Sequence, residues 1–392
     1  MGSFVSHLEC SLTGEAYPAR EVHGRSPAGA PLLVRYDLAA LKAALSKDVL
    51  RARGGGLWRY GELLPVEMEK NRLTLGEAMT PLVRAPRIEA LRGGGELFIK
   101  DESRLPGGTA QARGAALAAA MAKELRVKRL ALAADGAYGA AVAAYAARAG
   151  LHTTVFCPLG TDPEIIDAVA IRGAIIRRVN GSIADCARIV REGAGIAGWF
   201  DVSAGSEPYF IEGMKTAGFE LAEQSGWELP DWIVHPADEG VIGLAKAFDE
   251  LEAIGWIGAK RPKMIAVATD ASDPVIRAWE TDEGLVSPRE ALIIRAVRAS
   301  GGFCIAVDEA GAERALTEMA REEGVLLARA GAAAFAAYLS AVLERRIGRS
   351  DRVVLFNSGA GVPHPAAEAG PVLDPNAPLD YTQFRLNTSG DD

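Results

Sequence analysis

Short apolar runs alternate with segments of helical apolar spacing along most of the chain. From residue 96 onward, runs rich in Val, Ile, Leu and Phe are bounded by polar or glycine-containing stretches, as buried strands are. The segments between them carry apolar residues three and four positions apart, as helices do. A strand and its helix together span roughly 22 to 25 residues, the length of one β-α step. The expected strands are 96–102, 127–134, 152–158, 174–179, 231–237, 263–269, 303–307 and 352–361, and the expected helices are 115–125, 136–150, 163–173, 183–194, 210–226, 240–255, 289–300 and 310–324.

The first 91 residues are less regular. They contain a strand-like run at 32–38, a helical pattern at 38–46 and a proline-punctuated connection at 76–91. Strands that are apolar on both faces, with helices between them, predict a mostly parallel sheet. Ligands bind such sheets at the carboxyl ends of the strands, so the loops that follow the strands are where function is expected.

Composition and charge exclude several classes of function. The 392 residues include 43 Lys and Arg against 51 Asp and Glu, a net charge of -8, which argues against a nucleic-acid partner. We find no run of roughly 18 apolar residues, so no membrane span is expected. The start of the chain, MGSFVSHLEC, lacks the features of a signal peptide. The four cysteines lie far apart, which predicts neither a disulfide framework nor a zinc site and fits a cytoplasmic location.

The order of several longer motifs carries a family resemblance. The motifs are HLECSLTGEAYPA, RYDLAALKAAL, LGEAMTPL, FIKDES, AAYAARAG, VFCP, GWFDVS, EPYFIEGMKT, KAFDELEAIGWIG and VVLFN. In this order they resemble the threonine synthases, which belong to the fold-type-II family of pyridoxal-phosphate (PLP) enzymes, related to the tryptophan synthase β chain. The resemblance covers most of the chain.

The resemblance implies an α/β fold of the fold-type-II kind, with two domains that each hold a mostly parallel sheet flanked by helices. A cofactor cleft is expected between the two domains. The implied parts are an N-terminal segment (1–75), a discontinuous large domain (76–106 and 206–370), a small domain (107–205) and a tail (371–392).

The chain departs from the resembled family at the position of the Schiff-base lysine. The family carries the pattern Gly-Ser-Phe-Lys-x-Arg-Gly, and the corresponding stretch at 108–114 reads GTAQARG. Gln111 therefore takes the place of the lysine. An amide has no nucleophilic amine and cannot form the internal aldimine. Lys100 and Lys215 have counterparts in relatives that keep their own Schiff-base lysine, so neither is expected to substitute for it.

A second departure lies in the turn before the expected helix at 136–150. The family places there an asparagine that contacts the phenolic oxygen of PLP, and this position is Ala137. The bulky Tyr138 follows it, where relatives have small residues. Asp135 precedes the turn and has two interpretations. It either caps the helix or faces the former cofactor cavity.

A third departure lies in the expected phosphate loop, PADEGV (236–241). The resemblance implies amide groups that point at a phosphate from a helix N-terminus, but Asp238 and Glu239 stand before Gly240 here. A like-charge contact at about 4 Å costs on the order of 1 to 4 kcal/mol, so two carboxylates would repel a phosphate. Alternatively, both acids merely complement the dipole of the following helix.

The C-terminal loop, NSGAGVPH (357–364), is the fourth site. Ser358 matches the position at which relatives hold the pyridine nitrogen with a hydroxyl or thiol. His364 is the candidate general base. No metal site is expected, because the candidate ligands Asp135, Asp238, Glu239 and His364 come from separate loops without ligand spacing.

These departures predict a threonine synthase-like protein without covalently bound PLP and without threonine synthase activity. The candidate site residues are Gln111, Asp135, Tyr138 and His364, beside the altered positions Ala137, Asp238, Glu239, Gly240 and Ser358. The expected partner is a small non-phosphate ligand, amine-bearing or cationic, in the cleft between the domains of a monomer or homodimer.

Three alternatives remain open at this point. The protein is an enzyme of lyase or hydrolase type with PLP-independent acid-base chemistry, a residual PLP-dependent threonine synthase or lyase, or a regulatory or scaffolding paralogue without activity. Gln111 itself is either a ligand-binding group or the product of drift after the lysine was lost.

Overall fold

The computed structural model describes residues 2–281 and 287–361. The chain divides into two compact units, Met1–Gly361 and Val362–Asp392, and all that follows concerns the first. The predicted tail and His364 lie outside the described residues.

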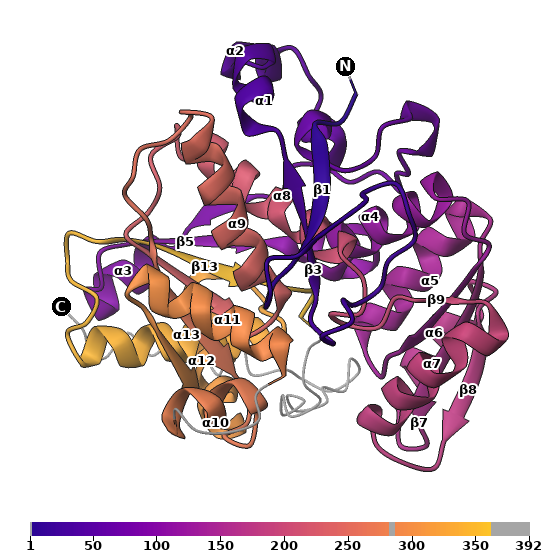
Figure 1. Ribbon diagram of the computed structural model, residues 1–392. Helices are drawn as coiled ribbons and strands as arrows, with labels where there is room; N and C mark the ends of the chain where they lie inside the picture. The colour runs from indigo at the N-terminus through magenta and orange to yellow at the C-terminus, as the bar shows by residue number, and fades with distance from the viewer. Residues whose placement is uncertain (1, 282–286, 362–392) are drawn as a thin grey trace, which may run out of the picture. The chain divides into compact units, whose positions relative to one another are not determined.

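Three sheets form the framework of the described chain (Figure 1). The strands are β1 (Val5–Cys10), β2 (Ala16–Tyr17), β3 (Leu32–Tyr36), β4 (Leu82–Arg84), β5 (Glu96–Asp101), β6 (Arg129–Ala133), β7 (His152–Pro158), β8 (Ile175–Val179), β9 (Phe200–Asp201), β10 (Trp232–Pro236), β11 (Lys263–Ala268), β12 (Phe303–Ala306) and β13 (Arg352–Asn357). Their orders are β2-β1-β3, β12-β11-β10-β13-β5-β4 and β8-β7-β6-β9.

The two larger sheets confirm the predicted α/β class. The four-stranded sheet is parallel throughout, and the six-stranded sheet is parallel except for β4, which pairs antiparallel with β5. The small sheet of β1, β2 and β3 is antiparallel. The four-stranded sheet draws on 129–201 alone, and the six-stranded sheet on segments before and after it. The domain boundaries at 107 and 205 stay a prediction.

Helices cover both larger sheets. They are α1 (Leu38–Ala44), α2 (Lys47–Arg51), α3 (Pro86–Arg92), α4 (Gln111–Glu124), α5 (Ala137–Ala149), α6 (Pro163–Ala170), α7 (Ile183–Ala197), α8 (Tyr209–Gln224), α9 (Glu239–Ala253), α10 (Pro274–Thr281), α11 (Pro288–Ser300), α12 (Glu309–Glu323) and α13 (Arg329–Leu343), with 3₁₀ turns η1 (Leu57–Leu63), η2 (Glu69–Asn71), η3 (Glu102–Arg104) and η4 (Pro106–Gly108). In Figure 1, α5, α6 and α7 accompany the four-stranded sheet on the right. On the left, α11, α12 and α13 accompany the six-stranded sheet.

Helix α8 is the central helix of the core and is buried over nearly its whole length. It packs against α4 on one side and α9 on the other. Glycines make this close approach possible, because a Cβ on Gly213 would lie 2.0 Å from the carbonyl oxygen of Arg113. A Cβ on Gly218 would lie 2.6 Å from the Cβ of Ala247. The chain therefore holds α4, α8 and α9 in one rigid layer beneath the candidate site.

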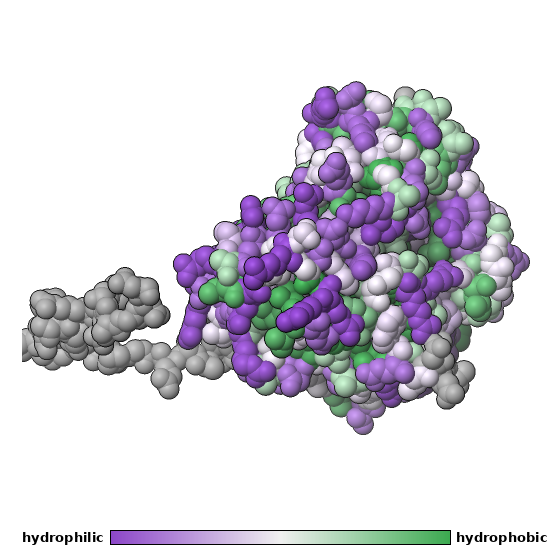
Figure 2. Space-filling view, turned by 90° about the vertical axis from the view of Figure 1, so that its left-hand side faces the viewer, coloured by the Kyte–Doolittle hydropathy of each residue, from purple (hydrophilic) through white to green (hydrophobic). Residues whose placement is uncertain are grey.

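Within the part of the chain that the structure describes, no helix is both long and apolar enough to cross a membrane. Figure 2 views the molecule from the left of Figure 1 and shows hydrophobic residues lying between hydrophilic ones on that face. The most exposed large hydrophobic side chains include Leu343, 85% exposed at the end of α13, and Leu91 in α3.

Candidate functional site

Two of the predicted site loops are joined by backbone hydrogen bonds. The Ala110 N–H donates to the carbonyl oxygen of Ser358 over 2.8 Å, and the Ala360 N–H donates to that of Gly108 over 2.7 Å. The loop that starts α4 therefore lies against the loop that follows β13, as the parallel sheet requires for loops at the carboxyl ends of its strands. Gln111 and Ser358 thus belong to one site.

Gln111 is the first residue of α4 and is half-buried. Its backbone N–H lies 3.3 Å from Oγ1 of Thr109, which satisfies one of the donors at the helix start. The side-chain amide makes no hydrogen bond with the residues described here. An amide with free donor and acceptor atoms is suited to a polar ligand but not to covalent chemistry.

Tyr138 is packed into the site rather than free within it. Its hydroxyl donates to the carbonyl oxygen of Val202, and its ring meets that of Phe210 edge-on at 5.0 Å. Ala110 and Met214 complete this apolar cluster, which we call the Tyr138 cluster. A Cβ on Gly114 would lie 2.3 Å from the Phe210 ring, so the ring fits against α4 only because residue 114 is glycine.

No side chain in the turn before α5 caps this helix. The residue at the N-cap is Gly136, which has no side chain to offer, and Asp135 is exposed. The capping interpretation of Asp135 is therefore wrong. Its carboxylate stays available to solvent and to any ligand that reaches the turn. The neighbouring Ala137 is also exposed.

Two acidic side chains, Asp238 and Glu239, lie at the start of α9, and both are already bound to other groups of the protein. Oδ1 of Asp238 accepts from the Gly240 N–H over 2.8 Å, so this acid caps the helix. The buried Glu239 is bound by Arg289, whose Nε and Nη2 lie 2.5 and 3.1 Å from its two oxygens. The ring of His235 lies close behind, because a Cβ on Gly240 would be 2.2 Å from its Cε1.

The electrostatics of these two acids differ. Burial raises the pKa of Asp238 above its ordinary value, although the nearby His235 acts in the opposite direction. Burial would also raise the pKa of Glu239, but the Arg289 guanidinium beside it brings that pKa below its ordinary value. The start of α9 therefore offers a neutralised carboxylate and a capping carboxylate, not a set of free amides.

One acid of the site, Glu207, was not identified from the sequence. Glu207 is 3% exposed and accepts from the backbone N–H groups of Tyr209 and Phe210 over 2.5 and 2.9 Å, so it caps α8. Burial raises the pKa of Glu207 to about 8, and the charges of Asp201 and Glu239 add to the effect. No local signal marks Glu207 in the sequence, because the N-cap position of α8 is Pro208 and Glu207 lies one residue before it.

Burial raises the pKa of Tyr138 well above its ordinary value, and the charges of Glu207, Glu239 and Asp201 add to this shift. The Tyr138 cluster is thus surrounded by carboxylates from the loops before α8 and α9. At pH 7 Glu207, with a pKa of about 8, is largely protonated, and Arg289 pairs with Glu239. The exposed Asp135 adds a charge at the turn before α5, and such a charge attracts cations.

The buried lysines are all engaged elsewhere. Nζ of Lys100 bonds to Glu220 and Gln224 over 2.9 Å each, and Nζ of Lys215 lies 2.5 Å from Glu212. Lys246 pairs with the same Glu212 over 3.2 Å. The other seven lysines are Lys42, Lys47 and Lys70 in the N-terminal segment, Lys123 near the end of α4, and Lys128, Lys260 and Lys263 before or at the start of parallel strands.

Among the described residues, no group of three or more His, Cys, Asp or Glu side chains has the arrangement of a metal site. All four cysteines are free and buried. His364, the predicted general base, is not among the described residues, so its role stays a prediction.

Comparisons with known proteins give the family context. A family model described as "Pyridoxal-phosphate dependent enzyme" matches residues 73–359. The threonine synthase of Methanocaldococcus jannaschii is 30% identical, over 91% of this chain and 93% of its own. That of Methanosarcina acetivorans is 30% identical, over 90% and 91%.

Solved structures show the same fold at lower identity. A structure of diaminopropionate ammonia lyase from Escherichia coli has a TM-score of 0.64 at 15% identity, covering 92% of this chain and 94% of that one. Maize serine racemase has a TM-score of 0.61 at 21% identity, covering 73% and 89%. At these identities the comparison establishes the fold alone.

Proposed function

The chain belongs to the family of pyridoxal-phosphate dependent enzymes, and from this premise we propose that it is a threonine synthase-like member that does not anchor PLP. In place of the cofactor it binds a small amine-bearing or cationic ligand at the acidic site around the Tyr138 cluster. The observation that carries the proposal is Gln111, a side chain without an amine, at the head of α4 against the loop of Ser358.

The residues of the site do not fit a lysine-anchored PLP. The three buried lysines are held in ion pairs with buried glutamates. The remaining lysines lie in the N-terminal segment, near the end of α4 or at the amino ends of strands, and the family's ligands bind at the carboxyl ends. These positions support the proposal that no lysine of the described chain forms an aldimine with PLP.

The start of α9 also argues against a phosphate group. A helix N-terminus holds a phosphate through free backbone amides and the positive end of the dipole. Here Asp238 already accepts from the Gly240 N–H, and Glu239 brings a second carboxylate. A phosphate would have to displace the first and lie beside the second. A cation or ammonium group would instead gain from Asp238 and from Asp135, since Arg289 already neutralises Glu239.

A ligand screen with matched probes tests this function. Melting temperatures are measured with 1,4-diaminobutane, calcium chloride and sodium phosphate at equal ionic strength. We expect the diamine to raise the melting temperature, and calcium chloride and phosphate to have no effect, because the described residues hold no group of ligands for a metal ion. Binding at about 100-fold excess over the dissociation constant adds about 2.7 kcal/mol of stability.

The variant Asp135→Asn/Asp238→Asn keeps side-chain size and the capping oxygen while removing two charges. This double variant should lose most of the rise in melting temperature that the cation causes. The control Asp167→Asn changes an exposed acid on α6 and should keep that rise. Stabilisation by phosphate alone, or equal responses of both variants, would overturn the proposal.

A second candidate is a PLP-dependent threonine synthase-type enzyme. It is favoured by the two relatives of 30% identity that bear this name and align over at least 90% of the chain. Because residue 111 is glutamine, this candidate requires a lysine from another part of the chain to reach the site.

A further inference from the structure

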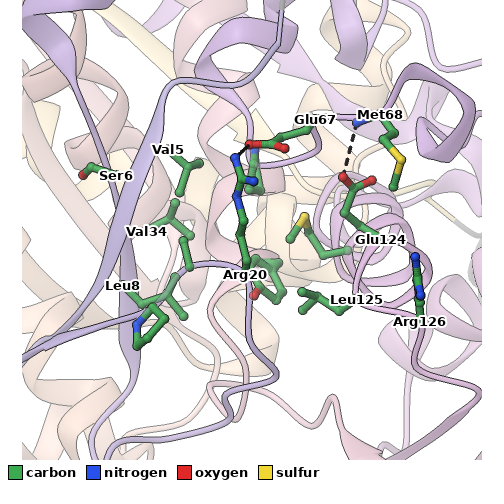
Figure 3. A pocket seen from close by; sticks show the side chains of 15 residues that line it. Val5, Ser6, Leu8, Arg20, Val34, Glu67, Met68, Glu124, Leu125 and Arg126 are labelled. Atoms are coloured by element: carbon green, nitrogen blue, oxygen red, sulfur yellow. Dashed lines mark hydrogen bonds and ion pairs between the residues drawn. The ribbon is translucent and has the colours of Figure 1, made fainter.

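A cavity of about 550 Å³ lies between the small antiparallel sheet and the C-terminal end of α4 (Figure 3). We call it the α4 pocket. Its size falls within the range of small-molecule sites, about 300 to 1,000 Å³. None of the predicted site residues lines it. Its lining consists of Val5, Ser6, Leu8, Pro18, Ala19, Arg20, Val34, Pro65, Glu67, Met68, Met121, Glu124, Leu125, Arg126 and Tyr209.

The floor of the α4 pocket is apolar. Leu8, Val34, Met121 and Tyr209 are each at most 3% exposed. Met68, by contrast, is 41% exposed. Methionine side chains adapt their shape to a bound apolar group, because they are unbranched and polarisable. The pocket is therefore suited to a compact apolar body, such as an aromatic ring or a branched alkyl chain.

One polar atom among the floor residues has no partner. The hydroxyl of Tyr209 is buried and makes no hydrogen bond with the residues that the structure describes. Leaving such a group unsatisfied costs about 1 to 3 kcal/mol, and buried polar groups in folded proteins generally have a partner. An oxygen of a bound molecule would supply the missing partner.

The rim carries charges of both signs, and within the described residues two of them have no ion pair, the carboxylate of Glu124 and the guanidinium of Arg126. Arg20 and Glu67 form an ion pair of 2.5 Å, and Glu124 accepts from Asn71 over 2.5 Å and from the Met68 N–H over 3.3 Å. Figure 3 shows a dashed line on each of these acids and none on Arg126. The exposed guanidinium of Arg126 has no ion pair or hydrogen bond with the described part of the chain. Its free charge favours an anion.

We propose that the α4 pocket binds a small organic carboxylate with an apolar body. The carboxylate pairs with Arg126, the body lies on the apolar floor, and a second oxygen accepts from or donates to the hydroxyl of Tyr209. This site goes beyond the proposed function and does not depend on it.

The test uses calorimetric titration of the full chain with three probes of one shape: phenylacetate, 4-hydroxyphenylacetate and the neutral phenylacetamide. We expect both acids to bind, the hydroxylated acid more tightly, and the amide to bind at least tenfold more weakly than phenylacetate. If neither acid binds at millimolar concentration, or if the amide equals phenylacetate, the proposal is wrong.

Two variants locate the bound probe, each with a matched control. Arg126 has a φ of 59°, so Arg126→Gly removes the guanidinium while keeping a backbone that glycine adopts freely. Arg345, with a φ of 58°, lies beyond the end of α13 and outside the pocket. We expect Arg126→Gly to weaken the binding of both probe acids at least tenfold, which corresponds to about 1.4 kcal/mol. Arg345→Gly should leave the binding of both acids unchanged.

Tyr209→Phe removes the unpartnered hydroxyl alone. It should abolish the advantage of 4-hydroxyphenylacetate over phenylacetate. Tyr338→Phe is the control, because Tyr338 is also buried with an unpartnered hydroxyl but belongs to α13. Equal effects of the members of either pair would overturn the site.

Discussion

At the scale of single residues, the site combines side chains whose polar atoms are already engaged with two, Gln111 and the exposed Asp135, whose polar atoms make no bond to the described residues. Tyr138 bonds to Val202, Asp238 caps α9 and Glu239 pairs with Arg289. The amide of Gln111 has no such bond to the described residues. A bound ligand therefore meets Gln111 and Asp135 first, and the engaged groups hold the shape around them.

The half-buried Tyr138 and the buried Tyr209 should respond differently to loss of the hydroxyl. Tyr138→Phe removes a partly buried hydrogen bond to Val202 and should lower the free energy of unfolding by about 1 kcal/mol. Tyr209→Phe removes a hydroxyl without a partner and should leave stability unchanged or raise it. Urea unfolding of both variants measures the difference, and equal losses would contradict the assigned bonds.

At the scale of elements, the parallel strands could be predicted because each is a short apolar run between helices. The predicted run at 152–158 coincides with β7, and those at 96–102 and 231–237 differ from β5 and β10 by one residue or less at each end. Helix α13 was missed because it is alanine-rich and largely buried, so it carries no clear polar stripe. Strand β1 was missed because its partners β2 and β3 follow later in the chain.

The candidate site could be predicted in part. The motifs located Gln111 and Ser358, and the structure brings their loops into contact. The contacts of Glu239 with Arg289 and of Tyr138 with Phe210 could not be predicted, because each joins segments at least 50 residues apart. Their pairing depends on the packing of α8, α9 and α11 rather than on any local pattern.

At the scale of the whole molecule, buried acids set the pH range of stability. Burial raises the pKa of Glu207 to about 8, against about 4.3 in an unfolded chain. Between these values the folded protein binds more protons, so the free energy of unfolding should fall as the pH rises from about 5 to 8. Glu220 acts oppositely. Although its burial raises the pKa, Arg113 and Lys100 lower it to about 2, so its contribution is lost as the pH falls below about 4.

Glu207→Gln isolates the first of these effects. The amide keeps one oxygen, which can accept from either Tyr209 or Phe210, and it cannot titrate. We expect the variant to reduce the decline in stability between pH 5 and 8, whose slope for one group is at most about 1.36 kcal/mol per pH unit. Denaturant unfolding across this pH range measures it. Glu69→Gln, at an exposed position, should keep the wild-type slope, and an unchanged slope in Glu207→Gln would refute the assignment.

The absence of a lysine anchor is the central claim, and the absorption spectrum of the purified protein with added PLP tests it most directly. A lysine aldimine absorbs at roughly 410–430 nm, and borohydride fixes it to the lysine as a stable adduct. We predict no such band and no PLP-modified lysine in the mass spectrum after reduction. A band in this region that borohydride abolishes, with the adduct on one lysine, would contradict the account and establish the PLP-dependent alternative.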